Sequence, residues 1–149
     1  MSTEFAYSTE TGSLARKLAH AARPSASLFV ALFAASDRLR MLGQTGKTSR
    51  LDRLVVDEAW CDAALELLPL EAPLWSIQRL CRDNGEWLCT LTRFPELPDW
   101  LDDSAEGRHS DMALAILGAL LERRARAASA RQPQLPQVLG TVADCADYR

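Results

Sequence analysis

The sequence LWSIQRLCRDNGEWLCTLTRF, which spans residues 74–94, carries the clearest structural signal in the chain. Its two halves, residues 74–82 and 86–94, alternate apolar and polar side chains and flank the turn residues Asp83-Asn84-Gly85. Alternation with a period of two is typical of strands, and a short connection containing Asn-Gly is typical of a β-hairpin. The segment therefore predicts two antiparallel strands.

The register of this hairpin follows from the pairing that best separates polar from apolar side chains. A two-residue turn at Asn84–Gly85 would pair Arg82 with Trp87 and mix the two kinds on both faces. A type I turn with Gly85 in a bulge pairs Cys81 with Trp87 instead. With Ile77 opposite Leu91, that register collects these apolar residues on one face: Trp75, Ile77, Cys81, Trp87, Cys89 and Leu91. We therefore predict the bulged turn.

Two apolar helices are predicted on either side of the hairpin. Residues 58–68 place apolar side chains at helical spacing, with Asp57 as the expected N-cap and Pro69 as the expected end. Residues 111–128 do the same, and Ser110 is the expected N-cap. The order helix, strand, strand, helix predicts an α+β fold in which helices pack on one small antiparallel hairpin or sheet.

The N-terminal third is predicted to add further helices to this core. Residues 14–22 form a short helix that Pro24 ends, and residues 27–42 form a longer one. Gly43 suits the left-handed position just past that helix. Residues 51–56 fit either a strand or a helix extension.

The chain of 149 residues is long enough for one domain with a real core. We divide it into a flexible N-terminus (1–13), an N-terminal helical region (14–50), an α-β-β-α core (51–128) and a linker or tail (129–149).

Two Ala/Leu-rich segments resemble the helices of a known family. Residues 62–69, DAALELLP, and residues 113–121, ALAILGALL, look like the two helices of the phage ABA sandwich domain. The resemblance covers about residues 57–125. It implies a small protein from a phage or from phage-like bacterial genes. The family has no catalytic residues to carry over, so the resemblance implies a fold and no mechanism.

The segment 99–111 is predicted to be an acidic loop, and it holds the densest group of candidate metal ligands. Carboxylates and imidazoles that converge could hold a divalent ion for hydrolysis. This gives an alternative function, a small metal-dependent hydrolase or nuclease that uses Asp99, Asp102, Glu106 and His109. Clustered carboxylates on a loop are more often solvated, and Asp111 suits the first turn of a helix.

Two other motifs have simpler structural explanations. Residues 43–48, GQTGKT, lack the first glycine of a phosphate-binding loop because Met41 occupies that place, so we expect a helix end followed by a solvated loop. A local basic patch suits the negative end of the last helix, and no nucleic acid is expected as a partner. That patch comprises Arg123, Arg124, Arg126 and Arg131.

Composition bounds the remaining function classes. The formal net charge is −3, and the longest apolar run, residues 28–35, is too short to cross a membrane. Cysteines 61, 81, 89 and 145 form no CxxC pair, so we expect free thiols in a cytoplasmic protein without a cofactor.

These observations favour a non-enzymatic interaction or accessory-subunit domain. A single hairpin has two open edges and needs help from residues 51–56 or from another chain. We therefore expect a protein partner or a homo-oligomer. The expected contact residues are Phe29, Val30, Phe33 and Trp100.

Overall fold

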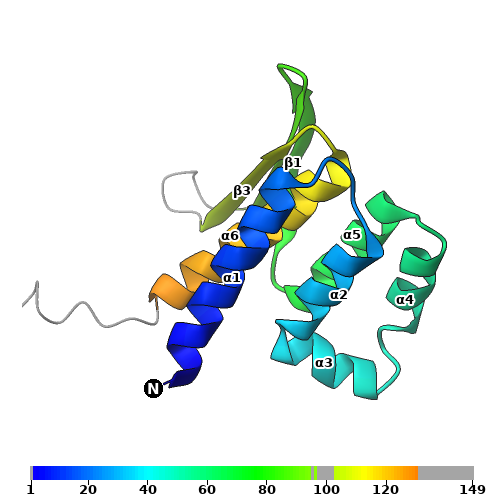
Figure 1. Ribbon diagram of the computed structural model, residues 1–149. Helices are drawn as coiled ribbons and strands as arrows, with labels where there is room; N and C mark the ends of the chain where they lie inside the picture. The colour runs from blue at the N-terminus through cyan, green and yellow to red at the C-terminus, as the bar shows by residue number, and fades with distance from the viewer. Residues whose placement is uncertain (1, 95, 97–102, 131–149) are drawn as a thin grey trace, which may run out of the picture.

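The computed structural model describes residues 2–94, 96 and 103–130 and has the predicted α+β class (Figure 1). In chain order its elements are α1 (Ser2–His20), α2 (Ala26–Ala34), α3 (Asp37–Gln44), α4 (Ser49–Val56), α5 (Trp60–Glu71), β1 (Ser76–Asp83), β2 (Glu86–Thr92), β3 (Ser104–His109) and α6 (Met112–Ala130).

The sheet is antiparallel, with strand order β1-β2-β3. Helix α6 packs against β3 and β2, and α1 lies alongside α6 (Figure 1). The four shorter helices α2–α5 gather into a second group, which we call the helical lobe, and α5 joins it to α6. One apolar core runs through both groups, from Leu32 and Leu67 in the lobe to Leu91 in the sheet.

The hairpin is where predicted, but the predicted bulge at its turn is wrong. Asn84 and Gly85 both have positive φ, 52° and 82°, which identifies a two-residue type I′ turn. Arg82 therefore lies opposite Trp87, the pairing that the sequence argument rejected. Type I′ turns are favoured because their twist matches the twist of the flanking strands.

A bulge elsewhere restores the separation of polar from apolar residues. The register of β1 shifts between Ile77 and Arg79, so that Ile77 still lies opposite Leu91 as predicted. Between the bulge and the turn the faces are reversed from the prediction. Leu80, not Cys81, lies on the same face as Cys89.

A third strand forms within the segment predicted to be an acidic loop. All six residues of β3 pair with β2, from Ser104 opposite Thr92 to His109 opposite Trp87. The sequence Ser-Ala-Glu-Gly-Arg-His has no β-branched residue and no Phe, Tyr or Trp, so its strand propensity is low. The help that the hairpin needs thus comes from β3. Residues 51–56 lie in helix α4, as one of the two alternatives expected.

The predicted helix over residues 27–42 is broken in two at Ser36. The Ser36 hydroxyl accepts a hydrogen bond from Leu39 N–H at 3.2 Å and so caps α3. Gly43 lies inside α3, and the left-handed residue after that helix is Gly46, with φ of 77°. The GQTGKT segment is therefore a helix end, as expected.

Other predicted helix limits also move. Asp57 ends α4, while α5 begins at Trp60 and continues past Pro69 to Glu71. The cap of α6 is Asp111 rather than Ser110, because Asp111 Oδ1 accepts from Leu114 N–H at 3.2 Å. Helix α1 begins at Ser2 instead of residue 14. Within the described residues, none of the helices has the length and apolarity needed to cross a membrane.

Gly107 lets β3 lie directly on α6. A Cβ atom at this position would overlap the carbonyl oxygen of Ala115 and the amide nitrogen of Ala119. Both are backbone atoms of a helix and cannot move aside singly. Gly118 faces the same contact from α6, but a Cβ there would be 3.5 Å from Leu18 Cδ2 and 3.7 Å from Gly107 Cα, which is ordinary contact.

We predict opposite effects for alanine at these two glycines. Gly107→Ala should lower the free energy of unfolding by about 3 kcal/mol or more, because β3 and α6 must separate. Gly118→Ala should be neutral or stabilise by up to about 1 kcal/mol, because alanine is the better helix former. Urea unfolding monitored by circular dichroism measures both, and equal destabilisation would contradict the close contact.

Candidate functional site

Strand β1 is an open edge of the sheet. It pairs with β2 on one side, and among the described residues no strand pairs with its other side. Helix α6 packs against the other two strands. The turn end of the hairpin projects beyond the helices (Figure 1). Ile77, Leu80 and Cys81 are half-buried, and Leu74, just before β1, is 69% exposed.

The backbone groups at this edge follow from the turn. In a two-residue hairpin the residues flanking the turn, here Asp83 and Glu86, form a hydrogen-bonded pair. Hydrogen-bonded and non-hydrogen-bonded pairs then alternate along an antiparallel ladder. The backbone groups of Arg79, Cys81 and Asp83 therefore form hydrogen bonds with β2. Leu80 and Arg82 direct their N–H and C=O groups away from the sheet.

Charged side chains of both signs line the same edge. The side chains of Arg79, Cys81 and Asp83 lie on the same face of β1, because they are two residues apart along the strand. Asp83 Oδ2 lies 3.8 Å from Arg108 Nη1, with both side chains about half exposed. Within the described part of the chain Arg79 has no ion-pair partner. On this face the described residues therefore offer one cation without an ion-pair partner, Arg79, and one weakly held anion, Asp83, four residues apart.

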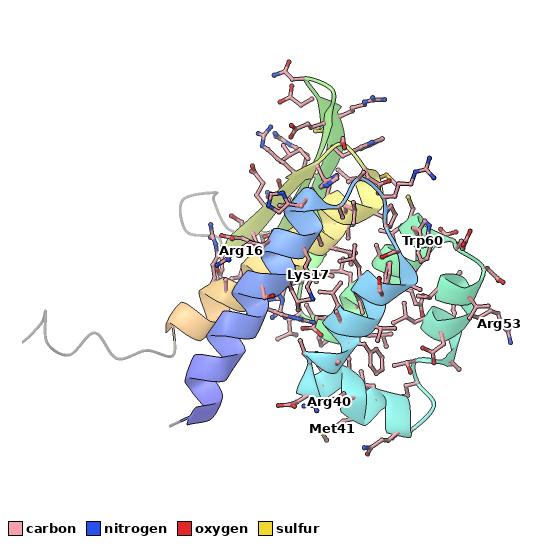
Figure 2. The ribbon with its side chains drawn as sticks, in the orientation of Figure 1. Arg16, Lys17, Arg40, Met41, Arg53 and Trp60 are labelled. Atoms are coloured by element: carbon pink, nitrogen blue, oxygen red, sulfur yellow. The ribbon has the colours of Figure 1, made fainter. Side chains whose placement is uncertain are left out.

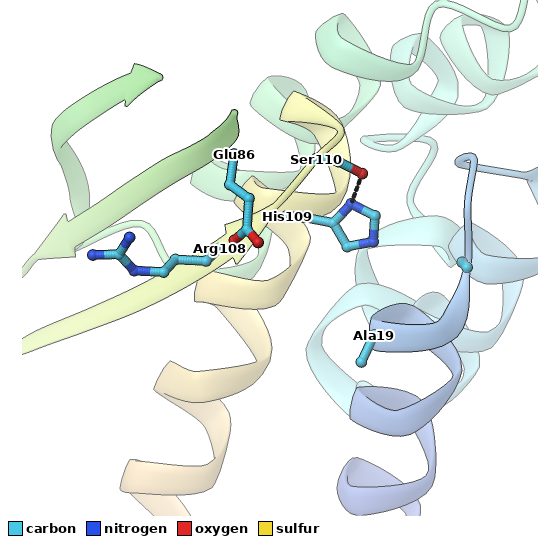
Figure 3. Close-up of a pocket in the computed structure, with 6 residues that line it drawn as sticks. Ala19, Glu86, Arg108, His109 and Ser110 are labelled. Atoms are coloured by element: carbon cyan, nitrogen blue, oxygen red, sulfur yellow. Dashed lines mark hydrogen bonds between the residues drawn. The ribbon is translucent and has the colours of Figure 1, made fainter. Parts of the chain in front are cut away.

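A small open hollow lies between the end of α1 and the end of β3 (Figure 3). Its volume is about 310 Å³, and its lining residues are Ala19, Ala21, Glu86, Arg108, His109 and Ser110. His109 Nδ1 accepts a hydrogen bond from Asp111 N–H at 3.0 Å and lies 3.4 Å from Ser110 Oγ. The ring hydrogen is then on Nε2, for which no described carboxylate is a partner. This arrangement orders the start of α6 and lacks the third group of a catalytic triad.

The predicted metal-ligand candidates are only partly within the described residues. Glu106 and His109 stand three residues apart on β3, so they lie on opposite faces. Glu106 is ion-paired with Arg108, at 3.2 Å. Asp99 and Asp102 fall outside the described residues. Among the residues that are described, no group of three or more potential ligands could hold a metal ion.

The predicted apolar contact residues have different exposures. Phe29 is buried and stacks on Trp60 at 5.7 Å between ring centroids. Phe33 is half-buried, while Val30 is 64% exposed. Trp100 lies outside the described residues. Elsewhere on the helical lobe, Figure 2 shows Met41 and Arg53 at the surface, and both are exposed.

A buried charge cluster centred on Glu71 was not predicted from the sequence. Glu71 Oε1 accepts from Arg124 Nε at 2.6 Å and from Arg123 Nη2 at 3.1 Å, and Glu71 Oε2 accepts from Ser36 Oγ at 2.8 Å. Arg124 Nη2 also donates to Leu32 O at 3.3 Å. Two residues of the predicted basic patch are therefore used inside the protein. The signal that could have found this cluster is a lone carboxylate within the apolar sequence LLPLEAPLW.

Glu71→Gln should lower the free energy of unfolding by about 3 kcal/mol or more, because it leaves buried Arg124 without its counter-ion. Glu66→Gln, on the same helix, is the matched control. Glu66 lies 3.6 Å from a largely exposed Arg50, so this change should cost less than about 1 kcal/mol. Chemical denaturation measures both, and similar losses would contradict a special role for Glu71.

Burial also affects the thiols. It raises the pKa of Cys89 from the ordinary value of 9.0 to about 11. Burial is the largest cause of a raised pKa at Cys61 too, followed by the charge of Asp111. Above pH 9 the unfolded chain therefore loses a proton that folded Cys89 keeps, and the free energy of unfolding falls as the pH rises toward 11.

This contribution, on the order of 3 kcal/mol over the whole window, should be present below pH 9 and lost as the pH rises toward 11. Urea unfolding of the native protein and of Cys89→Ala at about pH 8 and about pH 10.5 isolates it from other titrating groups. The native protein should lose more stability between the two conditions than the variant. Identical losses would show that Cys89 does not titrate as described.

Comparison with known proteins adds no relative to this picture. No family model, no curated protein and no solved structure matches the chain. The resemblance to the phage ABA sandwich domain stays a prediction, and the function has to be argued from the geometry of the β1 edge.

Proposed function

We propose that the chain is a non-enzymatic interaction domain that binds an extended strand of a protein partner at the open edge of β1. The observation that carries the proposal is the outward direction of the backbone groups of Leu80 and Arg82, with no described strand to receive them. An edge of this kind is a template for strand addition, in which main-chain hydrogen bonds supply affinity and side chains supply specificity.

The bulge and the charged residues of β1 limit which strands can pair with its edge. The bulge between Ile77 and Arg79 interrupts the ladder, so regular pairing is confined to residues 79–83. Charges at Arg79, Arg82 and Asp83 disfavour unselective pairing with apolar strands. A partner strand must therefore be short and must carry charges that match, which suits a specific subunit contact rather than aggregation.

The proposal extends to the setting of the protein. An accessory subunit of phage-related origin agrees with the resemblance of α5 and α6 to the phage ABA sandwich helices. Free thiols at Cys61, Cys81 and Cys89 support a reducing, cytoplasmic environment.

Arg82→Pro should abolish strand addition, because proline removes the outward N–H without removing a bond to β2. Arg82→Ala is the matched control, since it loses the same charge but keeps the N–H. Complexes isolated gently from the protein's own cells and measured by native mass spectrometry should survive Arg82→Ala and be lost with Arg82→Pro.

Hydrogen exchange gives an independent reading of the same edge. In the isolated monomer the Leu80 and Arg82 amides should exchange fast and the Cys81 amide slowly, and the complex should protect all three. Complexes that persist with Arg82→Pro, or that leave the Leu80 and Arg82 amides unprotected, would contradict the proposed edge.

A further inference from the structure

We propose that the strand received by β1 is β1 of a second copy, so that two chains form one continuous sheet about a two-fold axis at Cys81. This inference rests on the proposed function and names its partner. The register and charges of residues 79–83 support it.

Backbone geometry limits the possible registers. Two antiparallel edges can bond only if outward residues face outward residues. In β1 these are Leu80 and Arg82, so Leu80 can lie opposite Leu80, Arg82 opposite Arg82, or Leu80 opposite Arg82 of the second copy. Two-fold symmetry makes each of these contacts self-complementary.

Charge selects one of the three. Placing Arg82 opposite Arg82 sets like charges directly against each other, which is destabilising. Placing Leu80 opposite Leu80 puts Arg79 opposite Cys81 and gives no charge pair. Placing Leu80 opposite Arg82 puts Arg79 opposite Asp83, and symmetry repeats this ion pair on the other side of the axis. The only register with opposite charges therefore matches the unpaired Arg79 to the weakly held Asp83.

The described helices and strands leave room for this contact. Residues 79–83 form the half of β1 next to the turn, and the turn projects beyond the helices in Figure 1. Helix α6 packs against β3 and β2 and leaves the outer edge of β1 to the second copy. The half-buried Leu80 and Cys81 would each gain a neighbouring side chain from the second copy, Arg82 and Cys81 respectively.

The same register brings the two Cys81 residues together. Cys81 bonds to β2, so on the outer side it forms a non-hydrogen-bonded pair with Cys81 of the second copy. Such pairs have Cα atoms about 4.5 Å apart, within the range of about 4.4 to 6.8 Å that a disulfide spans. Cys81 is therefore a probe of the register, because a shift of the pairing would separate the two thiols.

The first experiment is sedimentation of the full chain with reductant at about 100 μM. The native protein should be a dimer. Arg79→Glu or Asp83→Arg should raise its dissociation constant at least about tenfold, because each change places like charges opposite each other. The double variant Arg79→Glu with Asp83→Arg restores both ion pairs with reversed sign. It should recover the dimer, which a merely structural defect would not do.

The second experiment is oxidation by added oxidised glutathione, which accepts the two electrons when two thiols form one disulfide. A disulfide-linked dimer should form in the native protein and in Cys61→Ser but not in Cys81→Ser. A monomeric native protein, no rescue by the double variant, or cross-linking that survives Cys81→Ser would overturn the inference. If the chain is monomeric but another protein protects the Leu80 and Arg82 amides, the second-copy inference fails while the proposed function stands.

Discussion

The buried carboxylate of Glu71 holds the two parts of the molecule together. Its side chain is only 4% exposed, and a charge so far from water is tolerated only when it is paired and fully hydrogen-bonded. The partners come from distant parts of the chain, Arg123 and Arg124 on α6 and Ser36 at the junction of α2 and α3. One carboxylate thereby fixes the end of α5 against α6 and against the junction of α2 and α3. The break at Ser36 serves this contact, because the hydroxyl that caps α3 also donates to Glu71.

Gly107 allows α6 to pack closely against β3. Only a residue without a Cβ lets the backbone of β3 lie on the backbone of α6, so the helix is seated beneath β3 and β2. In the described part of the chain the sheet has three strands, and β1 is the strand that α6 covers least. Among the described residues, β1 is an edge because no strand pairs with its outer side, and the position of α6 over β3 and β2 keeps the helix away from that edge.

Local patterns predicted the elements whose signal lies within a few residues. The hairpin was evident because alternation and Asn-Gly are both local, and the helical stripes of α5 and α6 were evident for the same reason. The turn register was wrong because a bulge between Ile77 and Arg79 corrects the polarity that the type I′ turn would otherwise upset. Strand β3 was missed because its pairing with β2, rather than its own propensity, makes it a strand. The apolar surroundings of Glu71 are visible in the sequence, but its partner Arg124 is not, because no local pattern links residues 53 positions apart.

The sequence predicted the candidate site only as a hairpin with open edges that need a pairing strand. Strand β3, which the sequence did not predict, pairs with one edge of the hairpin, and no strand among the described residues pairs with the other. Which of its backbone groups face outward depends on the type of turn, so the wrong register would have exchanged the inward and outward residues of β1. With the observed turn, Leu80 and Arg82 face outward, and Arg79 and Asp83 are left to select by charge. The two turn residues, Asn84 and Gly85, therefore determine which backbone groups of β1 the proposed pairing could use.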